Sequence, residues 1–214
     1  MNKRYNLVDS DSWQSFFSLV LFCGIALILS IPSARQVRFF DRIWIFSGIP
    51  VYFYTYILFM GIIGLNLGAI SARRGERGWM LLLLFGERLL LAQFLTLPYL
   101  LFERAAYPGK EGAFVLIFLY TYIVSFLCAL TSRLIEEPTR RISAHGFLLK
   151  YSLFIVYYLA PLSILPPLSP LGAVASLLSG EQASLLLLAY ATPVLLALAI
   201  LLLINRQLRR DHSV

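Results

Sequence analysis

Charged residues are scarce in this chain, and so are the residue types that build reactive sites. Only 14% of the 214 residues are charged, whereas 59% are hydrophobic, and the mean hydropathy is +0.79. A soluble domain of this length needs far more polar surface to cover its core, so the excess apolar residues face lipid. The composition therefore predicts an all-α integral membrane protein, with residues 1–214 forming a single transmembrane domain.

Cysteine and histidine are each represented by two residues. Cys23 and Cys128 both lie inside apolar runs, which favours small buried hydrophobes over a disulfide or a metal pair. No two His or Cys residues have the spacing of metal ligands, and no Ser or Cys has a nearby base. The G-x-x-x-x-G-K-[ST] loop that cradles phosphates is also missing. We therefore expect no catalytic residue, metal or cofactor in this chain.

Long apolar runs dominate what is present. A spanning helix needs about 20 predominantly apolar residues, and six runs bounded by charge meet or approach that length. The predicted transmembrane helices are 14–31, 43–70, 89–102, 113–134, 147–168 and 183–204. Residues 1–13 carry two acidic residues and no small-residue cleavage site follows the first run, so we expect an interfacial segment and a retained helix.

The net charge of +7 is divided among short basic clusters between the apolar runs. These clusters form no stripe or tail, which argues against a nucleic-acid partner. Six helices place both termini on one side of the membrane, and 13 of the 18 basic residues then fall on that side. By the positive-inside rule, both termini are predicted to be cytoplasmic.

Charges and aromatic residues follow the predicted helix ends. Glu87 and Arg88, like Glu103 and Arg104, flank the short third helix, so no charge is expected well inside the bilayer. The polar residues within helices are expected to hold helices together: Asn66, Gln93, Thr96, Thr121 and Ser125. Many aromatic residues of the second and fifth helices are expected in interfacial belts: Tyr52, Phe53, Tyr54, Tyr56, Phe59, Tyr151, Phe154, Tyr157 and Tyr158.

Segment 71–88 begins with a charged turn that contains two glycines and continues with a short apolar piece, 79–85. This piece is too short to span, so we expect it at the membrane surface or under the bundle, before the third helix begins. Its arginines also fit a plainer interpretation, in which they are positive-inside anchors with Glu76 as a local partner.

Segment 160–182 contains four closely spaced prolines, which exclude a continuous helix. Broken backbone at membrane depth must be buried in protein or line a cavity. We therefore predict a re-entrant segment at 169–182, with a short helix over 171–179 dipping into the outer leaflet. An ordinary extracellular loop broken by prolines is the alternative.

Both segments resemble parts of type-2 ABC exporter permeases, the membrane subunits of ATP-driven exporters. ARRGERGWMLLLLFGE is similar to the family's charged segment between helices two and three, with matches at Glu76, Arg77, Gly78 and the leucines 81–84. Trp79 replaces a threonine, and the second acidic residue and the closing proline are missing. The prolines of segment 160–182 resemble the proline pattern that precedes the short outer helices of this family. With six helices in the same order, the resemblance covers nearly the whole chain.

The resemblance implies roles for three groups of residues. The ATPase-coupling residues would be Arg73, Arg74, Gly75, Glu76, Arg77, Gly78, Trp79 and Glu87. The outer gate would comprise Pro161, Leu162, Leu165, Pro166, Pro167 and Pro170. The pathway lining would include Tyr52, Tyr56, Phe59, Phe154 and Tyr157.

The resemblance also implies a function: export of a hydrophobic or amphipathic substrate across the bacterial cytoplasmic membrane. The permease would pair with a second copy or a related permease and with two ATPase subunits, which would hold ATP and magnesium. One alternative is a non-transporting scaffold. Another is an intramembrane peptidase, because Glu136, Glu137 and Arg141 spell E-E-x-x-x-R, although the histidines such enzymes carry on later helices are replaced here by His145 and His212, outside the apolar runs.

Overall fold

The computed structural model describes residues 10–30, 51–74, 78–106, 111–136, 144–163, 165–179 and 183–211. These ranges are helical and contain no strand, which confirms the predicted all-α class. They form seven α-helices and two short 3-10 helices. In chain order these are α1 Ser10–Ser30, α2 Val51–Arg74, α3 Gly78–Ala106, α4 Glu111–Glu136, α5 Ala144–Leu159, η3 Ala160–Ser163, η4 Pro166–Leu168, α6 Pro170–Ser179 and α7 Ala183–Asp211.

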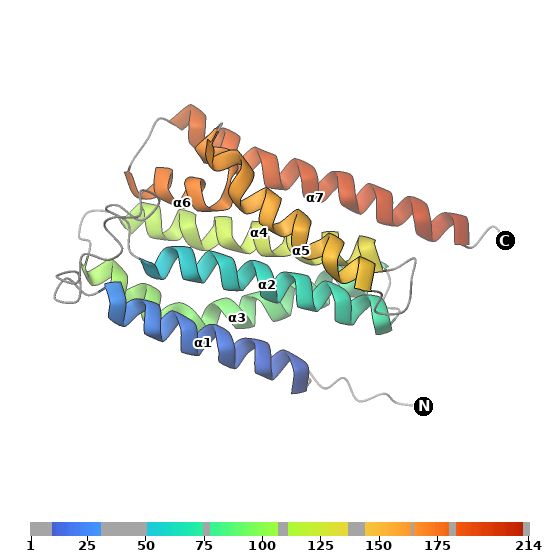
Figure 1. The fold of residues 1–214 in the computed structure, drawn as a ribbon, viewed down its shortest axis with the longest axis horizontal. Helices are drawn as coiled ribbons and strands as arrows, with labels where there is room; N and C mark the ends of the chain where they lie inside the picture. Colours follow the sequence, from blue (N-terminus) through green and yellow to red (C-terminus); the bar gives the residue numbers. More distant parts are fainter. Residues whose placement is uncertain are drawn as a thin grey trace.

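The six long helices lie side by side and alternate in direction (Figure 1). At one end, which we call the basal end, α2 and α4 finish, α3 and α5 begin, and the described part of the chain starts and finishes. At the opposite, apical end, α5 gives way to η3, η4 and the short α6 before α7 returns.

Three of the helices contain stretches long and apolar enough to cross a membrane: Tyr52–Arg74, Met80–Phe102 and Gly112–Glu136. Shorter apolar stretches occupy the described parts of three other elements: Trp13–Ile28, Gly146–Leu162 and Ala189–Ile204. Several helices of this kind in one chain indicate a multi-pass membrane protein.

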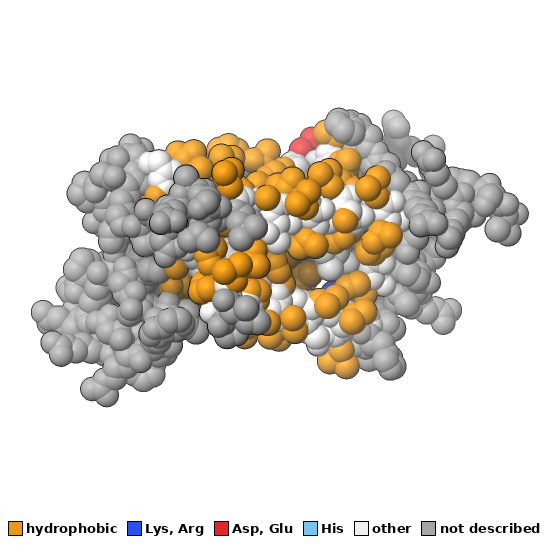
Figure 2. Space-filling view, turned by 90° about the horizontal axis from the view of Figure 1, so that it is seen from above, with side chains coloured by type: hydrophobic (Ala, Val, Ile, Leu, Met, Phe, Trp, Pro, Cys, Tyr) orange, Lys and Arg blue, Asp and Glu red, His pale blue; other side chains and the backbone are white. Residues whose placement is uncertain are grey.

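Large hydrophobic side chains cover the outside of the bundle. Phe17 of α1, Leu148 of α5 and Leu202 of α7 are 69%, 63% and 71% exposed. In Figure 2, hydrophobic side chains spread across the described surface of the face in view. A soluble monomer rarely exposes apolar area on this scale, so this surface fits a lipid surrounding.

The closest packing in the bundle joins α2 to α4. A Cβ added to Gly64 would lie 2.1 Å from the carbonyl oxygen of Ser125, and one added to Gly68 would lie 2.1 Å from that of Ala129. Residues four apart share one helix face, so these glycines form a strip on which the α4 backbone rests. Membrane helices use such small-residue strips because lipid gives them little hydrophobic reason to associate.

The start of α3 corrects one sequence prediction. Helix three was expected over 89–102, after a separate surface piece, but α3 runs without a break from Gly78. Its first turns contain strong helix formers and no proline, so nothing ends the helix there. The pair Glu87 and Arg88 was interpreted as a helix end, whereas Arg88 is buried in the bundle and only Glu87 is exposed.

Other boundaries shift by smaller amounts. α1 begins at Ser10, so the last residues of the expected interfacial segment 1–13 belong to this helix, and residues 1–9 lie outside the described residues. The start of the predicted helix 43–70 also lies outside them. The predicted helix 147–168 is divided: α5 ends at Leu159, and η3 and η4 follow. A short helix, α6, occupies nearly the predicted range 171–179.

Candidate functional site

A buried ion pair joins α4 to α5 near the basal end. The Nζ of Lys150 lies 2.5 Å from Oε1 of Glu136, and the two side chains are 7% and 8% exposed. The same Nζ lies 5.5 Å from the ring centroid of Tyr151 and 5.9 Å from that of Phe147. Because a buried charge needs a partner, each group of the pair neutralises the other in a largely apolar setting.

Asn66 on α2 connects the helices on either side of it. The hydroxyl of Tyr151 on α5 donates to Asn66 Oδ1 over 3.3 Å, and Asn66 Nδ2 donates to Ser15 Oγ on α1 over 3.4 Å. Both contacts are partly buried. This confirms that Asn66 holds helices together, and it places a half-buried polar group where three of them meet.

These polar groups surround a cavity of about 310 Å³, which we call the polar cavity. It lies between α1, α2, α4 and α5. Arg73, the next-to-last residue of α2, adds an exposed side chain to its wall. The lining residues are Gln14, Ser15, Asn66, Ala69, Ile70, Arg73, Glu136, Phe147, Lys150 and Tyr151.

A second space of about 250 Å³ lies on the other side of α5, between α2, α4, α5 and α7. We call it the apolar groove, because its described wall is almost wholly hydrophobic, with Lys150 as the one charged residue among the described lining residues. Lys150 therefore lines both spaces. The lining residues are Leu65, Leu127, Cys128, Thr131, Lys150, Leu153, Phe154, Tyr157, Leu196 and Ile200.

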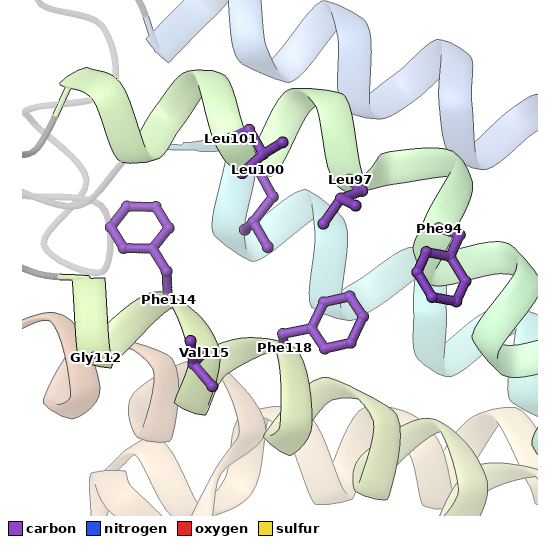
Figure 3. A pocket seen from close by; sticks show the side chains of 8 residues that line it. All are labelled: Phe94, Leu97, Leu100, Leu101, Gly112, Phe114, Val115 and Phe118. Carbon is purple, nitrogen blue, oxygen red and sulfur yellow. The ribbon is translucent and has the colours of Figure 1, made fainter.

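A third and larger space, about 520 Å³, lies between α3 and α4 towards the apical end (Figure 3). Its described side chains are all apolar, and Figure 3 shows those of α3 facing those of α4 across it. This described wall can hold hydrocarbon and has no group that orients a polar ligand. The lining residues are Phe94, Leu97, Leu100, Leu101, Gly112, Phe114, Val115 and Phe118.

Four charged side chains are buried between the helices, and for Arg88, which lies within the apolar stretch Met80–Phe102, this corrects the predicted position at a helix end. Arg88, Arg133, Glu136 and Lys150 are all buried, and Arg133 is only 1% exposed. Sequence position misleads here because a long side chain anchored near a helix end can turn inward to a partner as well as outward to the surface. The sequence did contain an indication of a buried charge at Lys150, because this residue interrupts the apolar run 147–168.

Among the predicted ATPase-coupling residues, the described ones lie at the basal end, apart from Glu87. Arg73 and Arg74 are exposed at the end of α2, while Gly78 and Trp79 begin α3. Gly75, Glu76 and Arg77 lie outside the described residues. Glu87 was expected in the same segment, but it lies nine residues into α3, about 14 Å from Gly78 at a rise of about 1.5 Å per residue.

The predicted outer-gate residues form a compact apical unit. The amide of Leu165 donates to the carbonyl of Pro161 over 2.8 Å, and a Cβ on Gly172 of α6 would lie 2.0 Å from the carbonyl oxygen of Pro166. Ser169 Oγ donates to the carbonyl of Tyr158 over 2.5 Å and accepts from the amide of Leu171 over 3.2 Å. Several backbone groups of this broken segment therefore find partners within the segment, and the Tyr158 carbonyl of α5 accepts from it.

Within this apical unit, exposure differs from residue to residue. Leu165 and Pro166 are exposed, and Pro161 and Leu162 are half-buried. Pro167 and Pro170 are buried. The exposed and half-buried residues thus form a surface at the apical end, whereas Pro167 and Pro170 lie in the interior beside α6.

Two of the five predicted pathway-lining residues lie in the middle of the core. Tyr52 and Tyr56 are fully buried and stack with a centroid distance of 5.9 Å. The belt prediction is therefore wrong for these two and for the buried Phe53 and Tyr54, because α2 is surrounded by other helices rather than by the interface. They cannot face a second copy of the chain in this conformation.

The remaining three pathway residues lie nearer the surface or a cavity. Phe59 is half-buried and stacks on Phe22 of α1 with a centroid distance of 4.6 Å. Phe154 and Tyr157 of α5 line the apolar groove. Phe154 also packs on Tyr158, whose hydroxyl donates to the carbonyl of Ile57 over 2.9 Å and ties α5 to α2.

Gln93 is a further polar group in the core. Its Nε2 donates to the hydroxyl of Tyr56 over 3.1 Å and to the carbonyl of Phe118 over 2.8 Å. This one amide links α2, α3 and α4, which confirms its predicted role between helices.

Of the motif residues that suggested a peptidase, the structure describes Glu136. Glu136 is held by Lys150, whereas Glu137, Arg141 and His212 lie outside the described residues, as does the side chain of His145. Within the described ranges, no group of three or more His, Cys, Asp or Glu could hold a metal ion. In comparisons with known proteins, no family model, curated protein or solved structure matches this chain.

Proposed function

We propose that this chain is the membrane-spanning permease subunit of an ATP-driven export complex. The observation that carries the proposal is the order of its elements. A basic sequence lies between the end of α2 and the start of α3 at the basal end, and a proline-broken unit with the short α6 precedes the last helix at the opposite end (Figure 1). The resemblance to type-2 ABC exporter permeases implies this arrangement, with the two irregular segments on opposite sides of the membrane.

In this proposal all six long helices cross the bacterial cytoplasmic membrane, with both termini in the cytoplasm. The permease pairs with a second copy or a related permease. Two ATPase subunits beneath the pair bind ATP and magnesium. A hydrophobic or amphipathic substrate leaves on the apical side, where α6 is the re-entrant helix and the surface of Pro161, Leu162, Leu165 and Pro166 is the gate.

The packing of α2 supplies a mechanical route between the two ends. An ATPase that binds residues 73–79 would push on the turn between α2 and α3. Because the glycine strip rests on the α4 backbone, α2 and α4 would move as one body. α2 also holds the apical end of α5, through the bond from Tyr158 to Ile57. A displacement at the basal turn would thus be passed to the helix that leads into the gate.

Co-purification of the chain with a phosphate-loop ATPase from native membranes tests this proposal. We expect an ATPase in stoichiometric amounts, and we expect its loss when Glu76 and Arg77 are both changed to alanine. Glu87→Ala is the matched control, because Glu87 lies well up α3 and should retain the partner. The proposal fails if no ATPase co-purifies, or if it remains bound to the Glu76→Ala, Arg77→Ala variant.

The non-transporting scaffold makes a different prediction for the same complex. A scaffold would retain the ATPase, but the reconstituted complex would show no ATPase stimulation by any amphiphile and no nucleotide-dependent movement. Such movement can be followed by a spin-label pair on Phe17 and Leu202, which are exposed on α1 and α7. A permease changes this distance when ATP binds, and an unchanged distance would favour the scaffold.

A further inference from the structure

Lys150 lies where a polar space and an apolar space meet. On one side of α5 it borders the polar cavity, with Asn66 and Arg73 of α2 and Tyr151 of its own helix. On the other side it borders the apolar groove, with Leu153 and Tyr157. A charged site and a hydrocarbon-lined groove that share Lys150 have together the two-part character of an amphiphile.

The charges of the polar cavity favour an anion. Among the described lining residues, Arg73 and Lys150 contribute two positive charges and Glu136 one negative charge, so this part of the wall is net cationic. Lys150 has three N–H donors, and the described contact with Glu136 uses one of them. Tyr151 and Asn66 supply further hydrogen-bonding groups. A carboxylate or phosphate would therefore meet two cations and several donors in a partly dry setting.

The size and position of the two spaces limit the rest of the ligand. The groove, at about 250 Å³, and the cavity, at about 310 Å³, lie at or below the small end of ligand sites, which run from about 300 to 1,000 Å³. They fit one hydrocarbon chain and one small headgroup. The cavity is lined by Arg73 and Glu136 from the ends of α2 and α4, so it lies near the basal end, which the proposed topology assigns to the cytoplasmic leaflet.

We propose that the polar cavity and the apolar groove together bind a single-chain anionic amphiphile, with its acid group at Arg73 and Lys150 and its hydrocarbon chain along α5. Its acid group is a carboxylate or a phosphate, and it enters from the cytoplasmic leaflet. The inference rests on the proposed function in one respect: it names the substrate class of that permease.

Equilibrium binding to the purified, delipidated full chain tests the site without any ATPase. The probes are palmitate, palmitoyl lysophosphatidate and the zwitterionic palmitoyl lysophosphatidylcholine. We expect saturable binding of palmitate, of lysophosphatidate or of both. Binding of palmitate alone assigns a carboxylate and binding of lysophosphatidate alone a phosphate. Equal binding of the zwitterionic lipid, or no binding of either acid, overturns the proposal.

Two adjacent arginines provide a matched pair of variants for the charged part. Arg73→Gln removes a lining cation and should weaken binding of the acid about tenfold or more. Arg74→Gln removes the same charge from the next residue, which does not line the cavity, and should leave the affinity within about twofold. Equal effects of the two changes would show general electrostatic attraction and overturn the site.

Glu136→Gln should change the affinity for the acid in the opposite direction. Its carboxylate competes with the ligand for Lys150, so its neutralisation should tighten binding of the acid severalfold. If this variant fails to fold, the apolar part still tests the proposal. Leu153→Trp fills the groove and should abolish binding, while Ile155→Trp, two residues along α5 and exposed outside the groove, should not. Equal affinity of these two variants overturns the placement of the chain.

The binding result is independent of the result for the permease proposal. Loss of the ATPase partner would refute the exporter while leaving amphiphile binding measurable on the isolated chain. Absence of binding would refute this site while leaving ATPase co-purification unaffected.

Discussion

The Nζ of Lys150 lies 2.5 Å from Oε1 of Glu136, in a contact that joins the end of α4 to the start of α5. Residues 137–143, which connect the two helices, lie outside the described residues. The ion pair is a direct polar contact between α4 and α5 at the basal end. α5 is fixed at its other end by the bond from the Tyr158 hydroxyl to Ile57. α5 is therefore held to the bundle by polar contacts at both ends, with the two cavities between them.

Removal of one partner of the ion pair should cost more than removal of both. Lys150→Met leaves the Glu136 carboxylate buried without its cation, which should destabilise the chain by about 3–5 kcal/mol. Replacing both residues with apolar ones removes that unpaired charge and should recover most of the loss. Reversible unfolding in mixed detergent micelles measures this. Additive losses in the double variant Glu136→Leu, Lys150→Met would contradict a direct pair.

The glycine strip on α2 should tolerate no added methyl group. Gly64→Ala or Gly68→Ala places a Cβ 2.1 Å from a carbonyl oxygen of α4, so the two backbones must separate. Overpacking of this kind costs about 1–3 kcal/mol. Gly112→Ala is the control, because a Cβ there meets nothing within 4 Å. Thermal unfolding in detergent compares the three, and a loss at Gly112 equal to that at Gly64 would contradict the packing.

The sequence was sufficient for the features that composition and backbone chemistry determine. Apolar runs separated by charge gave the helical class, and four prolines gave the break after α5, because proline removes a donor wherever it stands. The short helix α6 followed from the same reasoning. Such rules are local, so they do not depend on which helices become neighbours.

Features that depend on neighbours could not be predicted in this way. Arg88 was interpreted as the end of a helix, although its side chain points into the bundle and α3 continues past it. Tyr52 and Tyr56 were assigned to a surface, although α2 turned out to be central. The contact between Lys150 and Glu136 and the two cavities beside it require the position of α5 relative to α2 and α4. The types of the side chains do not determine how α5 packs against α2 and α4.

Gln93 and Tyr56 should act as one unit in the core. Gln93→Leu removes the amide that bridges the Tyr56 hydroxyl and the carbonyl of Phe118, and should cost about 1 kcal/mol. Tyr56→Phe removes the acceptor of one of those bonds and should cost a similar amount. Because both changes break the same contact, the double variant should lose less than the sum, as measured by unfolding in detergent. Full additivity would show that the two groups are independent.

Ser169→Ala should loosen α6 without unfolding the bundle. Ser169 is completely buried, and its hydroxyl caps α6 by accepting from the amide of Leu171 while donating to the carbonyl of Tyr158. Without it, both backbone groups lose a partner, at a cost of about 1–3 kcal/mol. Hydrogen exchange over 170–179 should then accelerate about tenfold or more, while exchange in α2 and α4 stays unchanged.

Ser152→Ala is the matched control for this change, because Ser152 is exposed on α5. It should leave exchange in α6 as it is in the unchanged chain. The cap is refuted if both variants exchange alike. If the whole bundle accelerates together with α6, the apical unit is part of the global core rather than a separately opening element, and a gate that opens while α2 and α4 stay packed is excluded.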